Sequence, residues 1–230
     1  MCGIAGYVGD RESADVLVDA LSKLEYRGYD SAGIAVFDHG NIKVKKCKGR
    51  LANLVEKMDE EGKPQGHVGI GHTRWATHGE PSDINSHPHG NKRVTIVHNG
   101  IIENYKKLKD FLVGEGYSFA SETDTEVAAK LLDYYYDGDP MKTIAKVLSE
   151  IKGSYALGIM FRDFPDEIFA VRKDSPLIVG VGEHENFIAS DVPAIIHYTR
   201  DYYLLDQNEI AVIKKDSVKI LSLIHISEPT

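Results

Sequence analysis

The residue with the most reactive chemistry in this sequence is Cys2, which directly follows the initiator methionine. Removal of an initiator methionine is favoured when the next residue is small, and removal here would give Cys2 a free α-amine beside its thiol. The thiolate is the reactive form of cysteine, and an α-amine titrates at about 7.7–8.0, where a general base works well. Nucleophile and base would then share one residue, although the same position also suits a small, buried apolar residue. The other cysteine, Cys47, stands among lysines and is expected to be incidental.

The dipeptide Asn99-Gly100 allows two interpretations. Asn-Gly is a frequent two-residue turn of a β-hairpin. The same pair also suits an oxyanion hole, because the asparagine amide and the glycine backbone N–H can both donate to a developing negative charge. The local sequence alone leaves both interpretations open.

Two charged residues are candidates for binding a small charged substrate. Asp124 follows Thr123, which stands three residues before Glu126 in a capping-box pattern that predicts the start of a helix. Asp124 is then an acid in the first turn of that helix, and it can also bind an ammonium group. Arg74 opens a long segment rich in His, Gly and Pro, where its guanidinium could clamp a carboxylate and Trp75 could wall the pocket. The alternative for Arg74 is a surface ion pair.

Five histidines crowd one third of the chain and raise the question of a metal site. Their spacings of six, nine, two and nine residues match no short helical or knuckle ligand set, and no thiolates accompany them. Phosphate-loop and dinucleotide patterns are also missing from the sequence. We therefore expect no metal and no cofactor. The five histidines are His72, His78, His87, His89 and His98.

Many short apolar runs with helices grouped between them favour an α+β fold with largely antiparallel strands. Helical spacing of apolar residues predicts helices near residues 14–24, 51–58, 105–112, 126–135 and 141–151. Strands are predicted at residues 2–8, 34–37, 42–44, 68–71 and 94–97, and in seven later runs between residues 155 and 221. The segment 73–91 is too long for a simple connection, which is typical of a functional loop. No linker, repeat or low-complexity tract divides the chain, so one domain is expected.

The composition excludes several classes of protein. The chain has 230 residues and a formal net charge of −8, and this acidic balance argues against a nucleic-acid partner, whose phosphates require clustered Lys and Arg. No apolar run approaches the roughly 20 residues that span a bilayer, so no membrane role is expected. Two cysteines are too few for a disulfide framework, and the amino terminus lacks the pattern of a signal peptide. A cytoplasmic protein is expected.

The last nine residues, 222–230, do not fit the pattern before them. They read Ser-Leu-Ile-His-Ile-Ser-Glu-Pro-Thr, which resembles a translated sequencing adapter more than a protein terminus. We expect residues 1–221 to form the domain and residues 222–230 to be a non-native tail.

Taken together, five ordered motifs resemble the class II glutamine amidotransferases, which belong to the N-terminal-nucleophile hydrolases. The opening Cys2-Gly3-Ile4-Ala5-Gly6 is similar to the start of that family. The later motifs are similar to the glutaminase domain of the glucosamine-6-phosphate synthase family, and the resemblance extends to about residue 221. Five motifs in order are far more specific than any one of them. The later four are Tyr26–Gly33, Gly71–Gly79, His98–Asn104 and Ser121–Glu126.

The resemblance implies a four-layer αββα sandwich, in which two antiparallel sheets pack between helices. It also implies that Cys2 is the nucleophile, that its α-amine is the base, and that Asn99 and Gly100 form the oxyanion hole. Arg74 would hold the α-carboxylate of glutamine, and Asp124 its α-ammonium. The other implied site residues are Arg27, which supports the nucleophile, Trp75, Thr77 and His78, which line the glutamine site, and His87 near the pocket.

The implied reaction is hydrolysis of the side-chain amide of L-glutamine to glutamate and ammonia, as the ammonia-supplying half of glutamine–fructose-6-phosphate transamidation in aminosugar biosynthesis. The sugar-phosphate isomerase domains of that family are absent from this sequence, and the resemblance also allows a homodimer for the full-length enzyme. Alternatives of the same class are the amidotransferase domains of amidophosphoribosyltransferase, asparagine synthetase or glutamate synthase. A different class is a non-catalytic ammonia-channel or regulatory module with the same fold, and a metal-binding histidine protein is a third.

Overall fold

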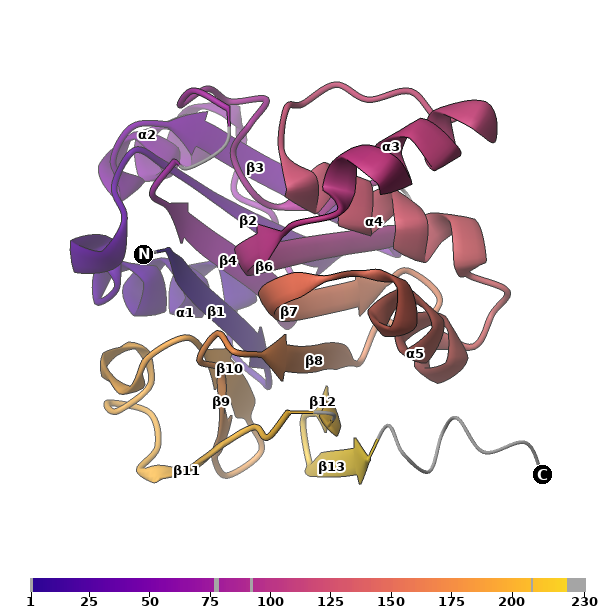
Figure 1. Ribbon diagram of the computed structural model, residues 1–230. Helices are drawn as coiled ribbons and strands as arrows, with labels where there is room; N and C mark the ends of the chain where they lie inside the picture. Colours follow the sequence, from indigo (N-terminus) through magenta and orange to yellow (C-terminus); the bar gives the residue numbers. More distant parts are fainter. Residues whose placement is uncertain (1, 77–78, 92, 208, 223–230) are drawn as a thin grey trace.

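The computed structural model describes residues 2–76, 79–91, 93–207 and 209–222. Within these ranges the strands form two antiparallel sheets that stack face to face, with helices on both outer surfaces (Figure 1). Three layers of apolar side chains hold the four layers together, one between the sheets and one under each group of helices. The expected αββα sandwich is therefore confirmed.

The elements follow one another in this order. The first part of the chain contains β1 (Gly3–Val8), α1 (Ser13–Ser22), the 3-10 turn η1 (Glu25–Arg27), β2 (Ser31–Asp38), β3 (Asn41–Lys48) and α2 (Leu51–Glu61). The middle part contains β4 (Val68–Arg74), β5 (His89–Gly90), β6 (Val94–Ile102), α3 (Tyr105–Gly114), α4 (Asp124–Tyr135) and α5 (Pro140–Glu150). The last part contains β7 (Gly153–Phe161), β8 (Ile168–Lys173), β9 (Ile178–Val181), β10 (Asn186–Ala189), the 3-10 turn η2 (Val192–Ala194), β11 (Asp201–Leu204), β12 (Glu209–Lys214) and β13 (Ser217–Ser222).

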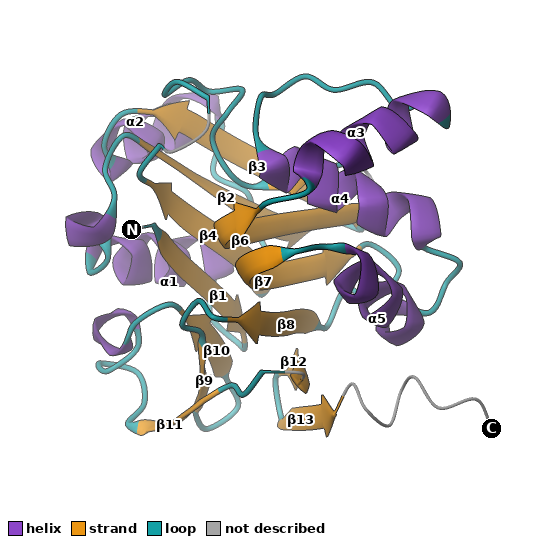
Figure 2. Ribbon diagram, in the orientation of Figure 1, coloured by secondary structure: helices purple, strands orange, loops and turns teal. Residues whose placement is uncertain are grey.

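Each sheet is covered by its own group of helices. In the described part of the chain, the first sheet has the strand order β11-β9-β10-β1-β4-β2-β3, and the second has the order β13-β12-β8-β7-β6-β5. Helices α1 and α2 pack on the first sheet, whereas α3, α4 and α5 lie over the second (Figure 2). The strands β1 and β4 of the first sheet face β6 and β7 of the second. The interior strands of both sheets therefore carry the residues that meet between them.

Strand β1 shows how one short sequence serves two cores. Ile4 and Val8 belong to the core between the sheets, whereas Ala5 and Tyr7 belong to the core under the first group of helices. This alternation follows from the two-residue repeat of a β-strand. Because both faces of β1 are buried, the run is apolar almost throughout.

The local signals in the sequence match the turns and helix starts. The hairpin between β2 and β3 turns at His39 and Gly40, which both have positive φ values of 49° and 80°, as a type I′ turn requires. Helix α4 begins where its cap predicts, because Thr123 Oγ1 accepts the N–H of Glu126 at 3.2 Å. The Glu126 carboxylate accepts the N–H of Ser121 instead of that of Thr123, so only one half of the capping box is formed.

Strand β13 ends at Ser222, the first residue of the segment 222–230 that was expected to be a non-native tail. Ser222 pairs with Glu209 at the end of β13, and residues 223–230 lie outside the described residues. The domain boundary expected after residue 221 stays a prediction. None of the helices in the described ranges combines the length and the apolar character that a membrane crossing requires.

Candidate active site

Segments that are far apart in the sequence meet at one edge of the sandwich. Cys2 directly precedes β1, and Arg74 ends β4. Because β1 and β4 are antiparallel neighbours, the beginning of one lies beside the end of the other. In the second sheet, Asn99 and Gly100 lie near the end of β6, and Asp124 begins the helix α4 that packs on this strand. The fold thus brings four separate segments to the same edge.

The Cys2 thiol lies against the backbone of Trp75. The N–H of Trp75 donates to Sγ of Cys2 at 3.2 Å, and Sγ lies 3.5 Å from the Trp75 carbonyl oxygen. Burial raises the pKa of the Cys2 thiol above its usual value of 9.0, and the Trp75 hydrogen bond and the Arg74 charge offset part of that rise. The thiol is therefore protonated near neutral pH and needs a base to become a nucleophile.

Asn99 and Gly100 lie inside strand β6, where both pair with β7, so the hairpin-turn interpretation of this dipeptide is wrong. Gly100 has a φ of +123°, and a Cβ atom there would lie 2.2 Å from the carbonyl oxygen of Ser154. Glycine alone fits this position without displacing β7. The Nδ2 group of Asn99 donates to the carbonyl oxygen of Cys2 at 3.0 Å. The amide of Asn99 therefore lies directly beside the candidate nucleophile.

Arg74 and Asp124 bring opposite charges to the same cavity. Their exposed fractions are 4% and 7%, and the burial of Arg74 excludes a surface ion pair for that residue. The Arg74 guanidinium donates to the carbonyl oxygen of Gly79 at 3.0 Å. Asp124 Oδ2 accepts the N–H of Ile102 at 2.8 Å, and its Oδ1 lies 4.0 Å from Nδ1 of His98. A cavity with a cation and an anion in its walls suits a zwitterion such as a free amino acid.

One small cavity unites most of the predicted site residues. The predicted residues in its lining are Cys2, Arg74, Trp75, His87, Gly100 and Asp124. Its lining also includes three residues that were not expected from the sequence, namely His98, Thr123 and Thr125. Each of these three adjoins a predicted residue in the sequence, and that adjacency is the signal that could have found them. Thr77 and His78, which were expected in the glutamine site, lie outside the described residues.

Arg27 is not part of this lining and lies beside the site in a cluster with Tyr26 and Asp191. The Arg27 guanidinium donates to Asp191 Oδ2 at 2.5 Å, and the Tyr26 hydroxyl donates to the same oxygen at 2.5 Å. Asp191 also accepts the N–H of Val192 at the start of η2, the element that follows β10. The ion pair fastens η1 to the segment beside β1. The sequence does not reveal Asp191, because it stands 164 residues from its partner.

Four of the five clustered histidines pack together next to the cavity. His72 and His87 stack with their ring centroids 4.1 Å apart, and His89 meets His87 edge-on at 5.0 Å. Thr125 Oγ1 lies 3.0 Å from Nδ1 of His98 and 3.3 Å from Nε2 of His87. Burial lowers the pKa of all four rings, to about 3 for His72 and His89, so they are neutral near pH 7. Among the described residues, no group of three or more His, Cys, Asp or Glu side chains is arranged to hold a metal ion.

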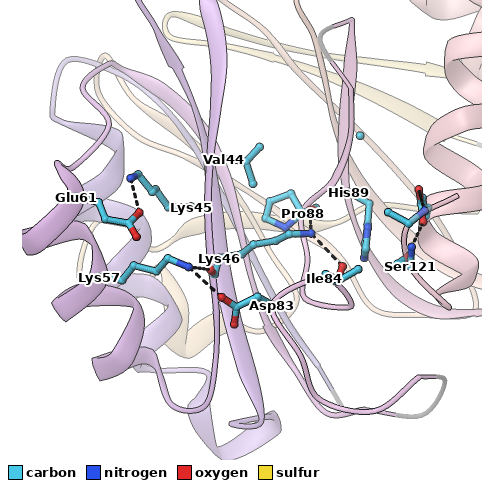
Figure 3. Close-up of a pocket in the computed structure, with 13 residues that line it drawn as sticks. Val44, Lys45, Lys46, Lys57, Glu61, Asp83, Ile84, Pro88, His89 and Ser121 are labelled. Carbon is cyan, nitrogen blue, oxygen red and sulfur yellow. Dashed lines mark hydrogen bonds and ion pairs between the residues drawn. The ribbon is translucent and has the colours of Figure 1, made fainter. Parts of the chain in front are cut away.

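A larger hollow of about 550 Å³ is lined by His89 and by residues of β3, α2 and the loop that precedes β5 (Figure 3). Two ion pairs lie in its walls, with Lys45 bound to Glu61 at 2.9 Å and Lys57 bound to Asp83 at 3.0 Å. No nucleophile with an adjacent base lines this hollow within the described ranges. The smaller cavity at Cys2 is therefore the better candidate for chemistry.

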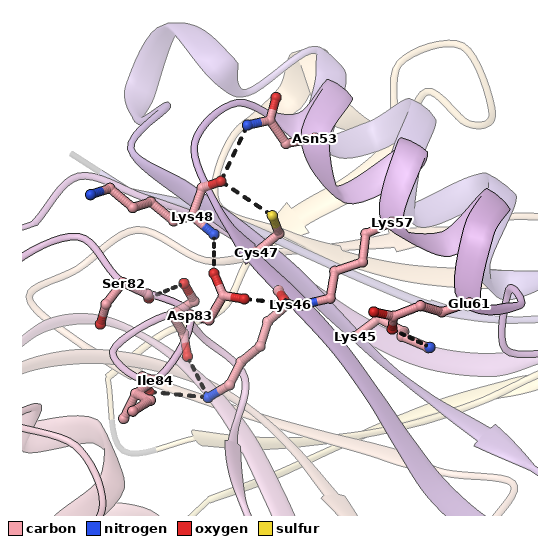
Figure 4. A network of polar contacts seen from close by, with 11 residues as sticks. Lys45, Lys46, Cys47, Lys48, Asn53, Lys57, Glu61, Ser82, Asp83 and Ile84 are labelled. Atoms are coloured by element: carbon pink, nitrogen blue, oxygen red, sulfur yellow. Dashed lines mark hydrogen bonds and ion pairs between the residues drawn. The ribbon is translucent and has the colours of Figure 1, made fainter.

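Lys46 connects the larger hollow to the site. Its Nζ group donates to the carbonyl oxygen of Ile84 at 3.2 Å (Figure 4) and to that of Ser86 at 2.9 Å. These two bonds hold the loop in front of His87 against β3. Burial lowers the pKa of Lys46. Asp83 adds a second attachment by accepting the backbone N–H of Lys48 at 2.7 Å. The long loop is thus fastened along β3 before it enters the cavity.

Comparisons with known proteins agree with this geometry. A family profile described as a glutamine amidotransferase domain matches residues 72–197. Two curated relatives are glutamine–fructose-6-phosphate aminotransferases (isomerizing). That of Caldanaerobacter subterraneus subsp. tengcongensis is 59% identical over 97% of this chain, and that of Clostridium tetani is 59% identical over 96%. The chain spans 37% and 36% of the length of these two proteins.

A solved structure is similar to this chain over most of its length. It is a glutamine phosphoribosylpyrophosphate amidotransferase from B. subtilis, complexed with ADP and GMP. The TM-score is 0.84 at 27% sequence identity, and the match covers 96% of this chain and 49% of that one. The similarity agrees with the sandwich of two antiparallel sheets between helices.

Proposed function

This chain belongs to the glutamine amidotransferase domain family, and from that premise we propose that Cys2 hydrolyses the side-chain amide of L-glutamine to glutamate and ammonia. The observation that carries the proposal is the convergence of Cys2, Arg74 and Asp124 on one cavity, with the Asn99 amide bound to the carbonyl oxygen of Cys2. A non-catalytic channel or regulatory module would not need a thiol with an amide donor and two opposite charges around it.

Activation of Cys2 starts with loss of Met1, which frees the α-amine of Cys2. Because burial raises the pKa of the thiol, little thiolate exists near neutral pH. The α-amine takes the thiol proton, and Sγ attacks the carbonyl carbon of the glutamine side chain. The Trp75 N–H, which donates to Sγ at 3.2 Å, holds the sulfur in position for this attack.

The tetrahedral intermediate carries its negative charge on the former amide oxygen. Asn99 uses one hydrogen of Nδ2 for the carbonyl oxygen of Cys2, and the second hydrogen remains for the oxyanion. The backbone N–H of Gly100 is the second donor. Collapse of the intermediate breaks the carbon–nitrogen bond, and the Cys2 ammonium gives its proton to the leaving ammonia. Water then hydrolyses the γ-glutamyl thioester to glutamate and regenerates the thiol.

Recognition of glutamine rests on its two charged groups. The Arg74 guanidinium binds the α-carboxylate, and the Asp124 carboxylate binds the α-ammonium. Both groups are nearly buried, where each opposite charge of the ligand is attracted more strongly than at an exposed surface. Trp75 and His87 contribute further walls.

We further propose that the released ammonia serves glutamine–fructose-6-phosphate transamidation in aminosugar biosynthesis. The proposal rests on the relatives of that name, which are 59% identical to this chain. Sugar-phosphate isomerase domains would belong to the remaining part of such proteins, since this chain spans 37% of the first relative. A homodimeric full-length enzyme and a cytoplasmic location are part of the same proposal.

Covalent labelling with a diazoketone analogue of L-glutamine tests the proposed activity. We expect one adduct per chain, located on the peptide that begins with Cys2, and excess L-glutamine should slow its formation. Cys2→Ala should prevent labelling, whereas Cys47→Ala, which removes the only other cysteine, should leave it unchanged. Persistent labelling of the Cys2→Ala variant would overturn the assignment, and so would an adduct on Cys47.

A further inference from the structure

We propose that His72 is a positioning residue of the oxyanion hole, and that its Nε2–H holds the Asn99 amide with Nδ2 toward Cys2. This inference rests on the proposed glutaminase function and extends it to a residue that does not touch the substrate. His72 lies in β4, in the interior of the first sheet, whereas Asn99 lies in β6 of the second sheet. The contact therefore crosses the interface between the two sheets.

The hydrogen bonds around Asn99 define the orientation of its amide. Nε2 of His72 lies 3.0 Å from Oδ1 of Asn99 and 3.0 Å from the backbone carbonyl oxygen of His98. On the other side of the amide, Nδ2 of Asn99 donates to the carbonyl oxygen of Cys2 at 3.0 Å. A flipped amide would place Oδ1 against the Cys2 carbonyl and Nδ2 against Nε2–H. Both contacts would then be repulsive.

The protonation state of His72 follows from its partners. Both atoms near Nε2 are oxygen acceptors, so Nε2 carries a proton. The ring is 1% exposed, and burial lowers its pKa to about 3. A neutral imidazole carries one N–H, which leaves Nδ1 as an unprotonated nitrogen. His72 therefore donates to Asn99 through Nε2–H, and this donor stays in place when the pH varies near neutrality.

The other ring nitrogen shows that packing alone does not account for His72. Nδ1 is buried and has no hydrogen-bond partner among the described residues. A buried polar atom without a partner destabilises a fold, so the contacts of Nε2 with Asn99 and His98 are what favours a histidine here. The stacking of His72 on His87 fixes the plane of the ring. A ring with a fixed plane, whose Nε2–H points at Asn99 Oδ1, can hold the Asn99 amide in one orientation.

The kinetic consequence separates this role from a role in binding. The oxyanion exists only after Sγ has attacked, so a misoriented Asn99 amide lowers kcat and leaves the KM for glutamine almost unchanged. Loss of one neutral hydrogen bond that fixes the amide corresponds to a decrease in kcat of about tenfold. A loss of general packing would instead lower the thermal midpoint and change kcat and KM together.

The test compares His72→Gln with His72→Met in the chain that lacks Met1. The amide nitrogen of Gln can occupy the position of Nε2 and donate to Asn99, whereas Met has similar length and no donor. We expect kcat of His72→Gln to stay within about threefold of the unsubstituted chain, and kcat of His72→Met to fall about tenfold, with KM unchanged in both. If His72→Met does not fold, His72→Leu takes its place. Equal kcat values for the Gln and the apolar variant would overturn the inference.

A second measurement keeps this inference separate from the proposed function. The side-chain amide of Asn99 should give one sharp pair of NMR signals in the unsubstituted chain and broadened or doubled signals in His72→Met. If the unsubstituted chain releases no glutamate, the proposed function fails and the NMR signals alone decide the role of His72. An unchanged pair of Asn99 signals in His72→Met would overturn the inference in either case.

Discussion

Mild acid is expected to destabilise this fold through its buried histidines. Burial lowers the pKa of His72, His87, His89 and His98, to about 3 for His72 and His89. In the unfolded chain each ring has its usual pKa of 6.5. Below that pH the unfolded chain therefore binds protons on rings that stay neutral in the folded chain. Stability is therefore fully present above pH 6.5 and is lost as the pH falls toward the folded value.

The magnitude follows from the unfolded pKa alone, because the folded rings stay neutral throughout mildly acidic pH. Between pH of about 7.5 and about 5.5, each such histidine lowers the free energy of unfolding by about 1.4 kcal/mol. His72 and His89 together account for about 3 kcal/mol, and His87 and His98 act in the same direction. This is a large share of the roughly 5–15 kcal/mol that stabilises a typical domain.

Urea unfolding of the purified chain at several pH values, followed by circular dichroism, measures the effect. His89→Gln removes one titrating ring that is not in the cavity lining, so its pH dependence should be smaller by about 1.4 kcal/mol. His197 is exposed and lies outside the buried cluster, so His197→Gln is the matched surface substitution. A free energy of unfolding that changes by less than about 1 kcal/mol across this range would refute the argument that these rings are buried and neutral.

Three substitutions test other parts of the account. Asn99→Ala removes one oxyanion donor and should lower kcat for ammonia release about a hundredfold or more, and an unchanged kcat would contradict the oxyanion assignment. Gly100→Ala places a Cβ 2.2 Å from the Ser154 carbonyl oxygen and should lower both the thermal midpoint and turnover. Gly116→Ala is the control, because Gly116 also has a positive φ but has open space around it, and it should lower the midpoint less and leave turnover unchanged. Lys46→Met removes the donor that holds the loop before His87, so it should raise the KM for glutamine and lower the free energy of unfolding by about 1–3 kcal/mol. If both values stay unchanged, the Lys46 hydrogen bonds do not hold the loop in place.

The sequence predicts most of the secondary structure because the periodicity of apolar residues is strong. Strand β1 alternates between two cores and still reads as one apolar run, since both of its faces are buried. The start of α4 was predictable from Thr123 and Glu126, which act within three residues of each other. Local signals of this kind depend on contacts that are near in the chain.

Contacts between distant residues explain what the sequence does not reveal. Asn99-Gly100 has the composition of a turn, but pairing with β7 keeps the dipeptide inside β6. The Arg27–Asp191 pair spans 164 residues, and no spacing rule connects the two. His72 acts on Asn99 through the packing of one sheet on the other. These partners become visible only when the sandwich is assembled.

Ammonia release from L-glutamine, measured together with the intact mass of the chain, tests whether Cys2 with a free α-amine hydrolyses glutamine. We predict that glutamate and ammonia form in equal amounts, that the rate rises with the fraction of chains whose mass shows loss of Met1, and that Cys2→Ala abolishes turnover. A chain whose mass shows complete removal of Met1, but which hydrolyses glutamine no faster than Cys2→Ala, would contradict the account.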